Sequence, residues 1–133
     1  NKNGTPWNIA VDSPIENLQT RERDTIIHIS DKAIATSGNY RKFYVKDGIK
    51  YSHTLNPSTG KPVTHSLLSA TVIANMCSTS DAFATAFMVM GTEGALKFVR
   101  EHPEENLEVY LLFANSKGEI QHAMSDGFSK YLE

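Results

Sequence analysis

The feature that most constrains the fold is the stretch from Ser78 to Gly91, which is almost wholly apolar after Asp81. Apolar side chains occupy nearly every position around such a helix, so we expect neighbouring elements to bury most of it. The stretch follows another apolar run, Leu67 to Ala74, whose length and β-branched residues indicate a buried strand. A chain that contains this pair needs a sheet against which the helix can pack.

Short turns and alternating segments predict that the remaining strands form hairpins. The strongest turn signal is Asp47-Gly48, a pair typical of two-residue hairpin loops. Helices are expected at 78–90, ended by Gly91 as a C-terminal cap, and at 93–101. Strands are expected at 7–11, 25–29, 32–35, 40–46, 49–54, 67–74, 107–114 and 119–124, with polar loops at 36–39 and 56–62.

Two adjacent helices among hairpin strands do not form the βαβα alternation of a parallel sheet. We therefore predict an α+β fold, a mostly antiparallel sheet packed against helices, in a single domain, 1–133. With 133 residues, of which 40% are hydrophobic, the chain is long enough to form a core. A net charge of −2 and the lack of a Lys/Arg run argue against nucleic-acid binding. No apolar run approaches the roughly 18 residues of a membrane span.

Asp81 and Thr85 are four residues apart and therefore share one face of the predicted helix. A buried carboxylate is costly unless it is paired, and carboxylate and hydroxyl oxygens are ligands for Mg²⁺. A metal site is one interpretation. The other is a capping box in which Ser78 is the N-cap and Asp81 reaches back to it, with Thr85 bonded to a carbonyl one turn earlier.

His53 ends a strand of the predicted hairpin, a position that presents side chains to loop-built sites. It is interpreted either as a proton-transfer or phosphate-binding group or as a structural histidine. The loop 56–62 and the segment 36–38 offer hydroxyls for a ligand, but both are also compatible with ordinary turns. The other histidines lack zinc-ligand spacing and are interpreted as surface or structural residues; they are His28, His65, His102 and His122.

Three segments match, in order, short motifs of one known family. Residues 35–41 match A-T-S-G-x-Y-R, residues 53–62 match H-x-x-[DN]-P-x-T-G-x-P, and residues 69–74 with 80–86 match S-x-T-V-x-A followed by x-D-A-x-A-T-A. Each motif is weak alone, but the three in this order are specific. The chain resembles the FAD:protein FMN transferase (ApbE) family, formerly described as thiamine biosynthesis lipoproteins.

The resemblance implies an ApbE-like, or T-fold-like, domain and assigns roles to particular residues. Asp81 and Thr85 match the side-chain ligands of the family's Mg²⁺, and His53 matches a histidine implicated in catalysis. The residues that match segments lining the FAD site are Thr36, Ser37, Gly38 and Thr59. Asn56 stands where many members have Asp, and an amide cannot act as a base.

The implied reaction is Mg²⁺-dependent transfer of FMN from FAD to a threonine or serine hydroxyl of an acceptor protein, with release of AMP. The expected acceptor is a flavoprotein redox subunit. Two alternatives are an FAD pyrophosphatase, which hydrolyses FAD to FMN and AMP, and a non-catalytic flavin-binding module.

The family has a larger N-terminal part with a G-G-x-x-K-G segment, which nothing in this chain matches. The chain is therefore expected to be the C-terminal portion of a longer enzyme, and this portion alone is expected to bind FAD poorly. Members that resemble it are exported lipoproteins. The implied location is the periplasmic face of a bacterial membrane, reached through an N-terminal lipid anchor that this chain does not contain.

Overall fold

The computed structural model describes residues 1–14, 23–39, 43–46, 49–52 and 54–132 of the chain. The strands are β1 (Trp7–Asp12), β2 (Arg23–Ile29), β3 (Ala33–Gly38), β4 (Phe43–Lys46), β5 (Ile49–Ser52), β6 (Leu55–Asn56), β7 (Lys61–Pro62), β8 (Leu67–Ala74), β9 (Glu108–Ala114) and β10 (Ile120–Met124). The helical elements are α1 (Cys77–Glu101) and two short 3-10 helices, η1 (Pro103–Glu105) and η2 (Asp126–Tyr131).

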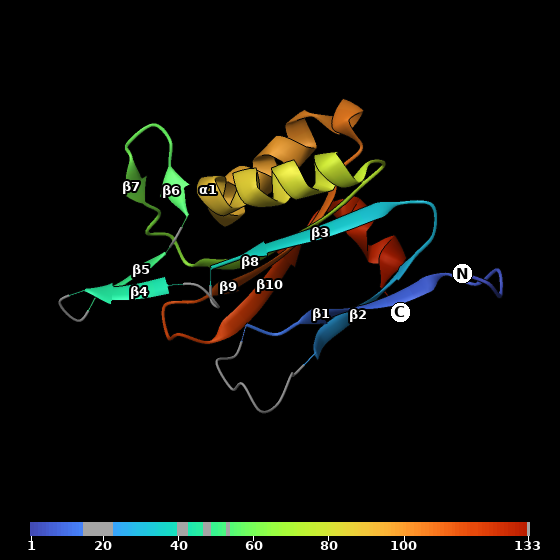
Figure 1. Cartoon of the computed structure of the whole chain (residues 1–133), viewed down its shortest axis with the longest axis horizontal. Coiled ribbons are helices and arrows are strands. Elements are labelled where there is room, and N and C mark those ends of the chain that lie inside the picture. The colour runs from blue at the N-terminus through green and yellow to red at the C-terminus, as the bar shows by residue number, and fades with distance from the viewer. Residues whose placement is uncertain (15–22, 40–42, 47–48, 53, 133) are drawn as a thin grey trace.

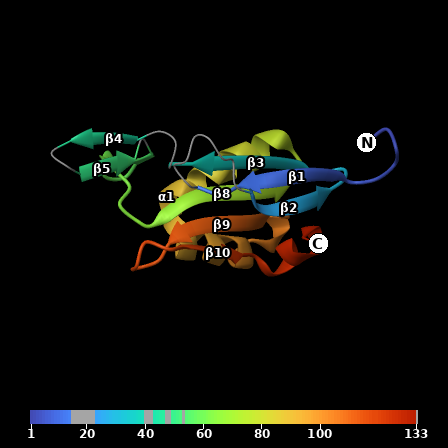
Figure 2. The same cartoon turned by 90° about the horizontal axis from the view of Figure 1, so that it is seen from below.

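The main elements form three layers, and an antiparallel sheet is the middle one (Figure 1). Its strand order is β10-β9-β8-β3, so β3 is the edge strand nearest to the β4–β5 and β6–β7 hairpins in the chain. Helix α1 covers one face of the sheet, while the β1–β2 hairpin and η2 cover the other (Figure 2). The predicted α+β fold with an antiparallel sheet packed against helices is confirmed.

The central strand β8 is buried on both faces, as its length and mostly apolar, β-branched sequence predicted. Val72 packs into the core beneath α1, and its neighbour Ile73 packs into the core beneath the β1–β2 hairpin. The same alternation holds in β9, where Val109 faces α1 and Leu112 faces the hairpin. Since both cores share this sheet, its strands hold the helix and the hairpin in fixed positions.

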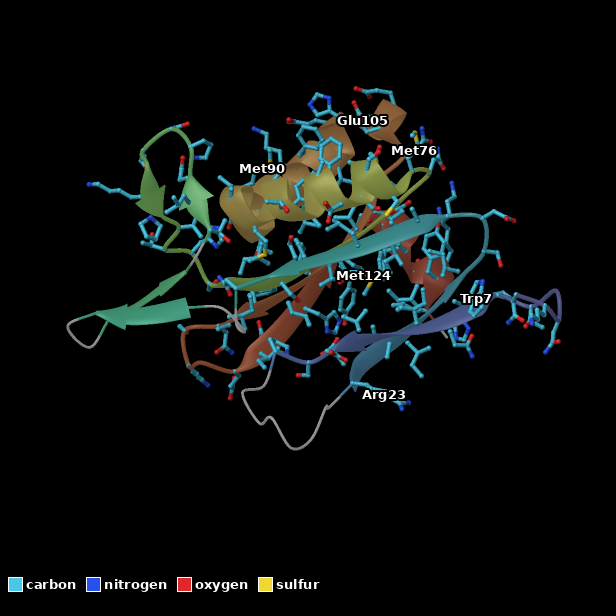
Figure 3. The ribbon with its side chains drawn as sticks, viewed as in Figure 1. Trp7, Arg23, Met76, Met90, Glu105 and Met124 are labelled. Carbon is cyan, nitrogen blue, oxygen red and sulfur yellow. The ribbon has the colours of Figure 1, made fainter. Side chains whose placement is uncertain are left out.

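The element α1 is two helices that reverse direction at Gly91, where φ is 77° and ψ is 177°. The rings of Phe83 and Phe98 lie 5.3 Å apart between centroids, although fifteen residues of continuous helix span about 22 Å. Figure 3 shows Met76 and Met90 at opposite ends of the first half, with Glu105 back beside the Met76 end. The prediction of two helices separated at Gly91 is confirmed.

The reversal also bears on membrane insertion. As one segment, α1 has the length and mean hydropathy of a membrane-spanning helix. Its halves, 77–90 and 92–101, are each shorter than the roughly 20 residues that cross a bilayer. Each half instead contributes apolar side chains to the core against the sheet, Phe87 from the first and Ala95 from the second.

His65 stabilises the end of the first helix. Its Nε2 atom lies 2.8 Å from the carbonyl oxygen of Met88, and its Nδ1 atom accepts the Leu67 N–H at 3.3 Å. Because Nδ1 accepts, Nε2–H is the donor to the Met88 carbonyl oxygen. The ring thus satisfies a carbonyl that would lack a partner at the helix end. His65 is a structural residue, in line with its interpretation from the sequence.

The strand β3 is longer than predicted. Residues 36–38, expected in a polar loop, pair with β8 through Thr36 opposite Thr71, Ser37 opposite Ala70 and Gly38 opposite Ser69. The loop prediction for these residues is wrong because the ladder to β8 satisfies their backbone groups. Thr36, Ser37 and Gly38 therefore have the fixed, alternating directions of strand residues.

Tyr110 provides a test of the contact between the sheet and the outer hairpin. Its buried hydroxyl donates a hydrogen bond to Asp24 Oδ2 at 2.6 Å, and burial together with the Asp24 carboxylate raises the pKa of Tyr110. Since folding favours the neutral phenol, its stabilisation is complete below about pH 10 and is lost as the pH rises further.

Tyr110→Phe is therefore expected to lower the free energy of unfolding by about 1 kcal/mol at neutral pH. Above pH 10 the variant should lose stability with pH less steeply than the wild type. Urea unfolding at several pH values measures both effects. Parallel pH profiles of the two proteins would contradict the expectation.

Candidate functional site

Asp81 and Thr85 lie in the first half of α1, which begins at Cys77. The capping-box interpretation is wrong, because the N-cap is Met76 with extended backbone and no side-chain cap bond. Ser78 is the second helical residue, and Asp81 lies beyond the first turn. Asp81 therefore has no role in capping this helix.

Both side chains are exposed, which corrects the expectation that they are buried. The helix points Ala84, Phe87 and Met88 into the core, and the last two lie three and four residues after Ala84, on the same face. Asp81 and Thr85 lie on the flank of this face rather than at its centre. The sequence around Asp81 and Thr85 is apolar for a second reason: other residues of the first half, such as Phe83, pack against the second half of α1. The sequence alone therefore did not show that these two side chains are exposed.

The Thr85 hydroxyl contacts β3. Its Oγ1 atom lies 3.0 Å from Ser37 Oγ, and either hydroxyl can be the donor. Asp81 is one helical turn before Thr85 on the same flank. Ser37, Asp81 and Thr85 therefore form an oxygen-rich group, here called the flank site, between the helix and the edge strand of the sheet.

The donor set of the flank site suits a hard cation. Across the described parts of the chain, no hydrogen bond or ion pair engages the Asp81 carboxylate. The same residues contain no group of three or more His, Cys, Asp or Glu side chains that could hold a metal. A cation at this position would therefore have one carboxylate, hydroxyl oxygen and further ligands from water or a phosphate, which is the usual environment of Mg²⁺.

Thr36 lies on the opposite face of the sheet from the flank site. Successive side chains of a strand alternate, and Ala35 packs into the core under α1 while Ile34 packs into the core under the hairpin. Thr36 accordingly bonds the buried Thr71 hydroxyl, with 2.8 Å between the two Oγ1 atoms. Gly38 is two residues after Thr36, so its α-carbon lies on the same side of the strand as that of Thr36. Of the three predicted FAD-site residues in β3, only Ser37 meets the helix.

Thr59 belongs to the tight turn between β6 and β7. Its Oγ1 atom accepts the Lys61 N–H at 3.3 Å, and the backbone N–H of Gly60 donates to Asn56 O at 2.8 Å. The Asn56 side chain accepts the N–H of Ser58 at 2.9 Å, which is an Asx turn. Asn56 thus stabilises the turn, a role that an Asp at this position would also fill.

The β6–β7 turn stands beside the Met90 end of α1 in Figures 1 and 3. Asp81 is five residues after Met76 and nine before Met90 in the sequence, so it lies nearer the other end of the first half of α1. Among the described residues, no hydrogen bond joins Thr59 to the flank site. His53 lies outside the described residues, so its predicted role stays a prediction. Two contacts were not predicted, Ser37 with Thr85 and His65 with Met88. The alternation of β3 would have indicated the first, had its strand been predicted through Gly38.

The three-layer fold is that of bacterial flavin transferases. The chain matches the solved structure of flavin transferase ApbE from Vibrio cholerae with a TM-score of 0.79 and 35% identity, over 99% of this chain and 40% of that one. It matches apo flavinyl transferase ApbE from Pseudomonas stutzeri with a TM-score of 0.76 and 28% identity, over 98% of this chain and 38% of that one.

The model of the ApbE family matches residues 1–111. Two curated relatives named FAD:protein FMN transferase, from Vibrio cholerae and Escherichia coli K12, are 36% and 38% identical over 132 residues, which is 99% of this chain. The chain belongs to the ApbE family, as its three motifs predicted. It spans 38% and 36% of the length of these two relatives.

Proposed function

We propose that this chain is the C-terminal portion of an enzyme that transfers FMN from FAD to a threonine or serine hydroxyl of an acceptor protein. Membership of the ApbE family and the names of its curated relatives support the reaction. The observation in the structure that carries the proposal is the 3.0 Å contact between Ser37 and Thr85. It joins two of the motif segments in one oxygen-rich group beside Asp81.

In this reaction the acceptor hydroxyl oxygen forms a bond to the phosphorus of the FMN half of FAD. The bond from that phosphorus to the bridging oxygen breaks, AMP leaves with the oxygen, and the hydroxyl proton passes to a base. We assign the movement of this proton to His53, by its match to the family histidine. The remaining task of the protein is to position the two phosphates and the acceptor.

The flank site is our candidate for binding Mg²⁺, with Asp81 and Thr85 as its side-chain ligands. When bound, Mg²⁺ would neutralise charge that develops on the phosphate oxygens and on the leaving AMP. The exposed Asp81 carboxylate contributes the negative charge that favours a cation here, and Thr85 contributes a neutral oxygen. The exposure of both side chains leaves room for a phosphate to approach.

Incubating the full-length protein with FAD, Mg²⁺ and a threonine-bearing acceptor is expected to give a fluorescent acceptor band in a denaturing gel. AMP should appear in equal amount. Release of AMP and FMN without labelling would instead indicate hydrolysis of FAD, and bound FAD without AMP would indicate a non-catalytic flavin-binding protein. The His53→Asn variant should label more slowly and with an altered pH profile.

We also propose a periplasmic location through an N-terminal lipid anchor, and a flavoprotein redox subunit as the acceptor. Both rest on the family resemblance alone. Recovery of the protein in the membrane fraction of lysed cells, with its release by protease added to intact spheroplasts, tests the location. Recovery in the cytosolic fraction would contradict it.

A further inference from the structure

The hydroxyl of Thr85 behaves differently from the other helix hydroxyl with a described partner. Ser80, buried in the same half of α1, donates back to the carbonyl oxygens of Met76 at 3.3 Å and Cys77 at 3.0 Å. Such back-bonds are the usual outcome for Ser and Thr in a helix. Within the described residues Thr85 makes no back-bond, and its partner is Ser37 on another element. The sheet therefore determines the orientation of the Thr85 hydroxyl.

A hydroxyl has one proton and two lone pairs, and its function as a ligand depends on where the proton points. When a cation takes a lone pair of the Thr85 oxygen, the proton must be donated in another direction. Ser37 Oγ, at 3.0 Å, is placed to accept that proton. A back-bond would use the same proton, but it would rotate the lone pairs toward a different side of the helix.

We infer that Ser37 is a positioning residue that accepts the Thr85 proton and so directs a Thr85 lone pair to the cation beside Asp81. This inference deepens the proposed function, on whose Mg²⁺ site it rests. Ser37 itself does not ligate the cation. It acts through Thr85, as hydrogen-bonding partners of metal ligands commonly do.

Small side chains surround the contact between Ser37 and Thr85. Ala70, fully buried, lies opposite Ser37 in the β3–β8 ladder, and Ala84, also fully buried, precedes Thr85 in the helix. Ala35 packs against the same core. These short side chains beside Ser37 and Thr85 are consistent with the close approach of the helix to the sheet edge, where the two hydroxyl groups meet at 3.0 Å.

Thr36 provides a matched control, one residue away in the same strand. Its hydroxyl also makes a single described contact, with Thr71, but on the opposite face of the sheet. Removing the Thr36 hydroxyl leaves the buried Thr71 hydroxyl without that partner, so the loss should appear in stability. Removing the Ser37 hydroxyl should appear in cation binding, because both members of its pair are accessible to water.

The experiment measures Mn²⁺, as a spectroscopic replacement for Mg²⁺, binding to the full-length protein by electron paramagnetic resonance. Ser37→Ala is expected to raise the Kd for Mn²⁺ roughly tenfold, a typical effect of losing a partner of a metal ligand. Its thermal melting should match that of the wild type without metal. Ser37→Thr, which keeps the hydroxyl, should restore Mn²⁺ binding. Thr36→Val should bind Mn²⁺ normally and melt at a lower temperature.

Activity supplies a second readout. In FMN transfer, Ser37→Ala should require a higher Mg²⁺ concentration for half-maximal rate, and saturating Mg²⁺ should restore the rate. Unchanged Mn²⁺ binding in Ser37→Ala, with weaker binding in Thr85→Val, would overturn the role of Ser37 and leave the metal site intact. If Thr85→Val also binds Mn²⁺ as the wild type does, the metal assignment within the proposed function fails, and the role of Ser37 fails with it.

Discussion

Asp81→Asn is expected to lower the rate of FMN transfer by the full-length protein about 100-fold or more at fixed Mg²⁺. The carboxylate is the one charged side chain of the flank site, and charge stabilisation by a bound cation contributes several kcal/mol to a transition state. Asn keeps the size of the side chain and removes its charge. AMP release and acceptor labelling both measure the effect.

The matched control is Glu93→Gln, which removes another exposed carboxylate from α1, outside the flank site. The free energy of unfolding of both variants should lie within about 0.5 kcal/mol of the wild-type value, because substitutions at exposed positions without special contacts rarely change stability more. Full activity of Asp81→Asn would remove this residue from the metal site. Equal losses in Asp81→Asn and Glu93→Gln would point to a general effect of charge.

Gly91→Ala is expected to destabilise the protein by about 3 kcal/mol. With φ at 77° and ψ at 177°, Gly91 occupies a region that is essentially restricted to glycine, and a side chain there costs about 1–3 kcal/mol. An added Cβ would also lie 3.1 Å from the His65 ring. Moving the ring aside by a few tenths of an ångström would strain its hydrogen bonds to Met88 and Leu67.

Gly118→Ala is the control for a substitution at a glycine of positive φ that has no close neighbour. Gly118 also has a positive φ, 81°, but an added Cβ there would meet nothing within 4 Å, so we expect a loss of only about 1 kcal/mol. Denaturant unfolding of the two variants in the full-length protein gives the difference. A loss for Gly91→Ala no greater than that for Gly118→Ala would show that His65 does not restrain the reversal.

Much of the fold could be predicted because its signals are local. The mostly apolar segment of β8 and the glycine after Met90 each specify a structure within a few residues. The antiparallel pairing of β4 with β5 agrees with the hairpin predicted around Asp47-Gly48, although these two residues lie outside the described ones. The polar segment of β3 gave the opposite local signal. Its strand structure depends on pairing with β8, about thirty residues later in the chain, and no local pattern contains that information.

The candidate site, like the fold, was predictable from the sequence only where the signal is local. The spacing of Asp81 and Thr85 determined that they share a helical flank, and the motifs determined the family. Their exposure was not predictable from the apolar neighbours, because it depends on which side of the helix meets the sheet. The motif around Thr36 and Ser37 predicted one group of FAD-site residues, whereas the strand separates them to opposite faces.

By itself, the sequence determined the α+β class, the end of the first helix at Gly91, the family and the residue types available for phosphate chemistry. These properties follow from periodicity, turn chemistry and short motifs, all of which act over a few residues. Only the tertiary structure decided that Ser37, and not Thr36, meets Thr85, and that Asp81 caps no helix. The contact between Ser37 and Thr85 joins residues 48 positions apart, and it depends on how the helix packs against the sheet.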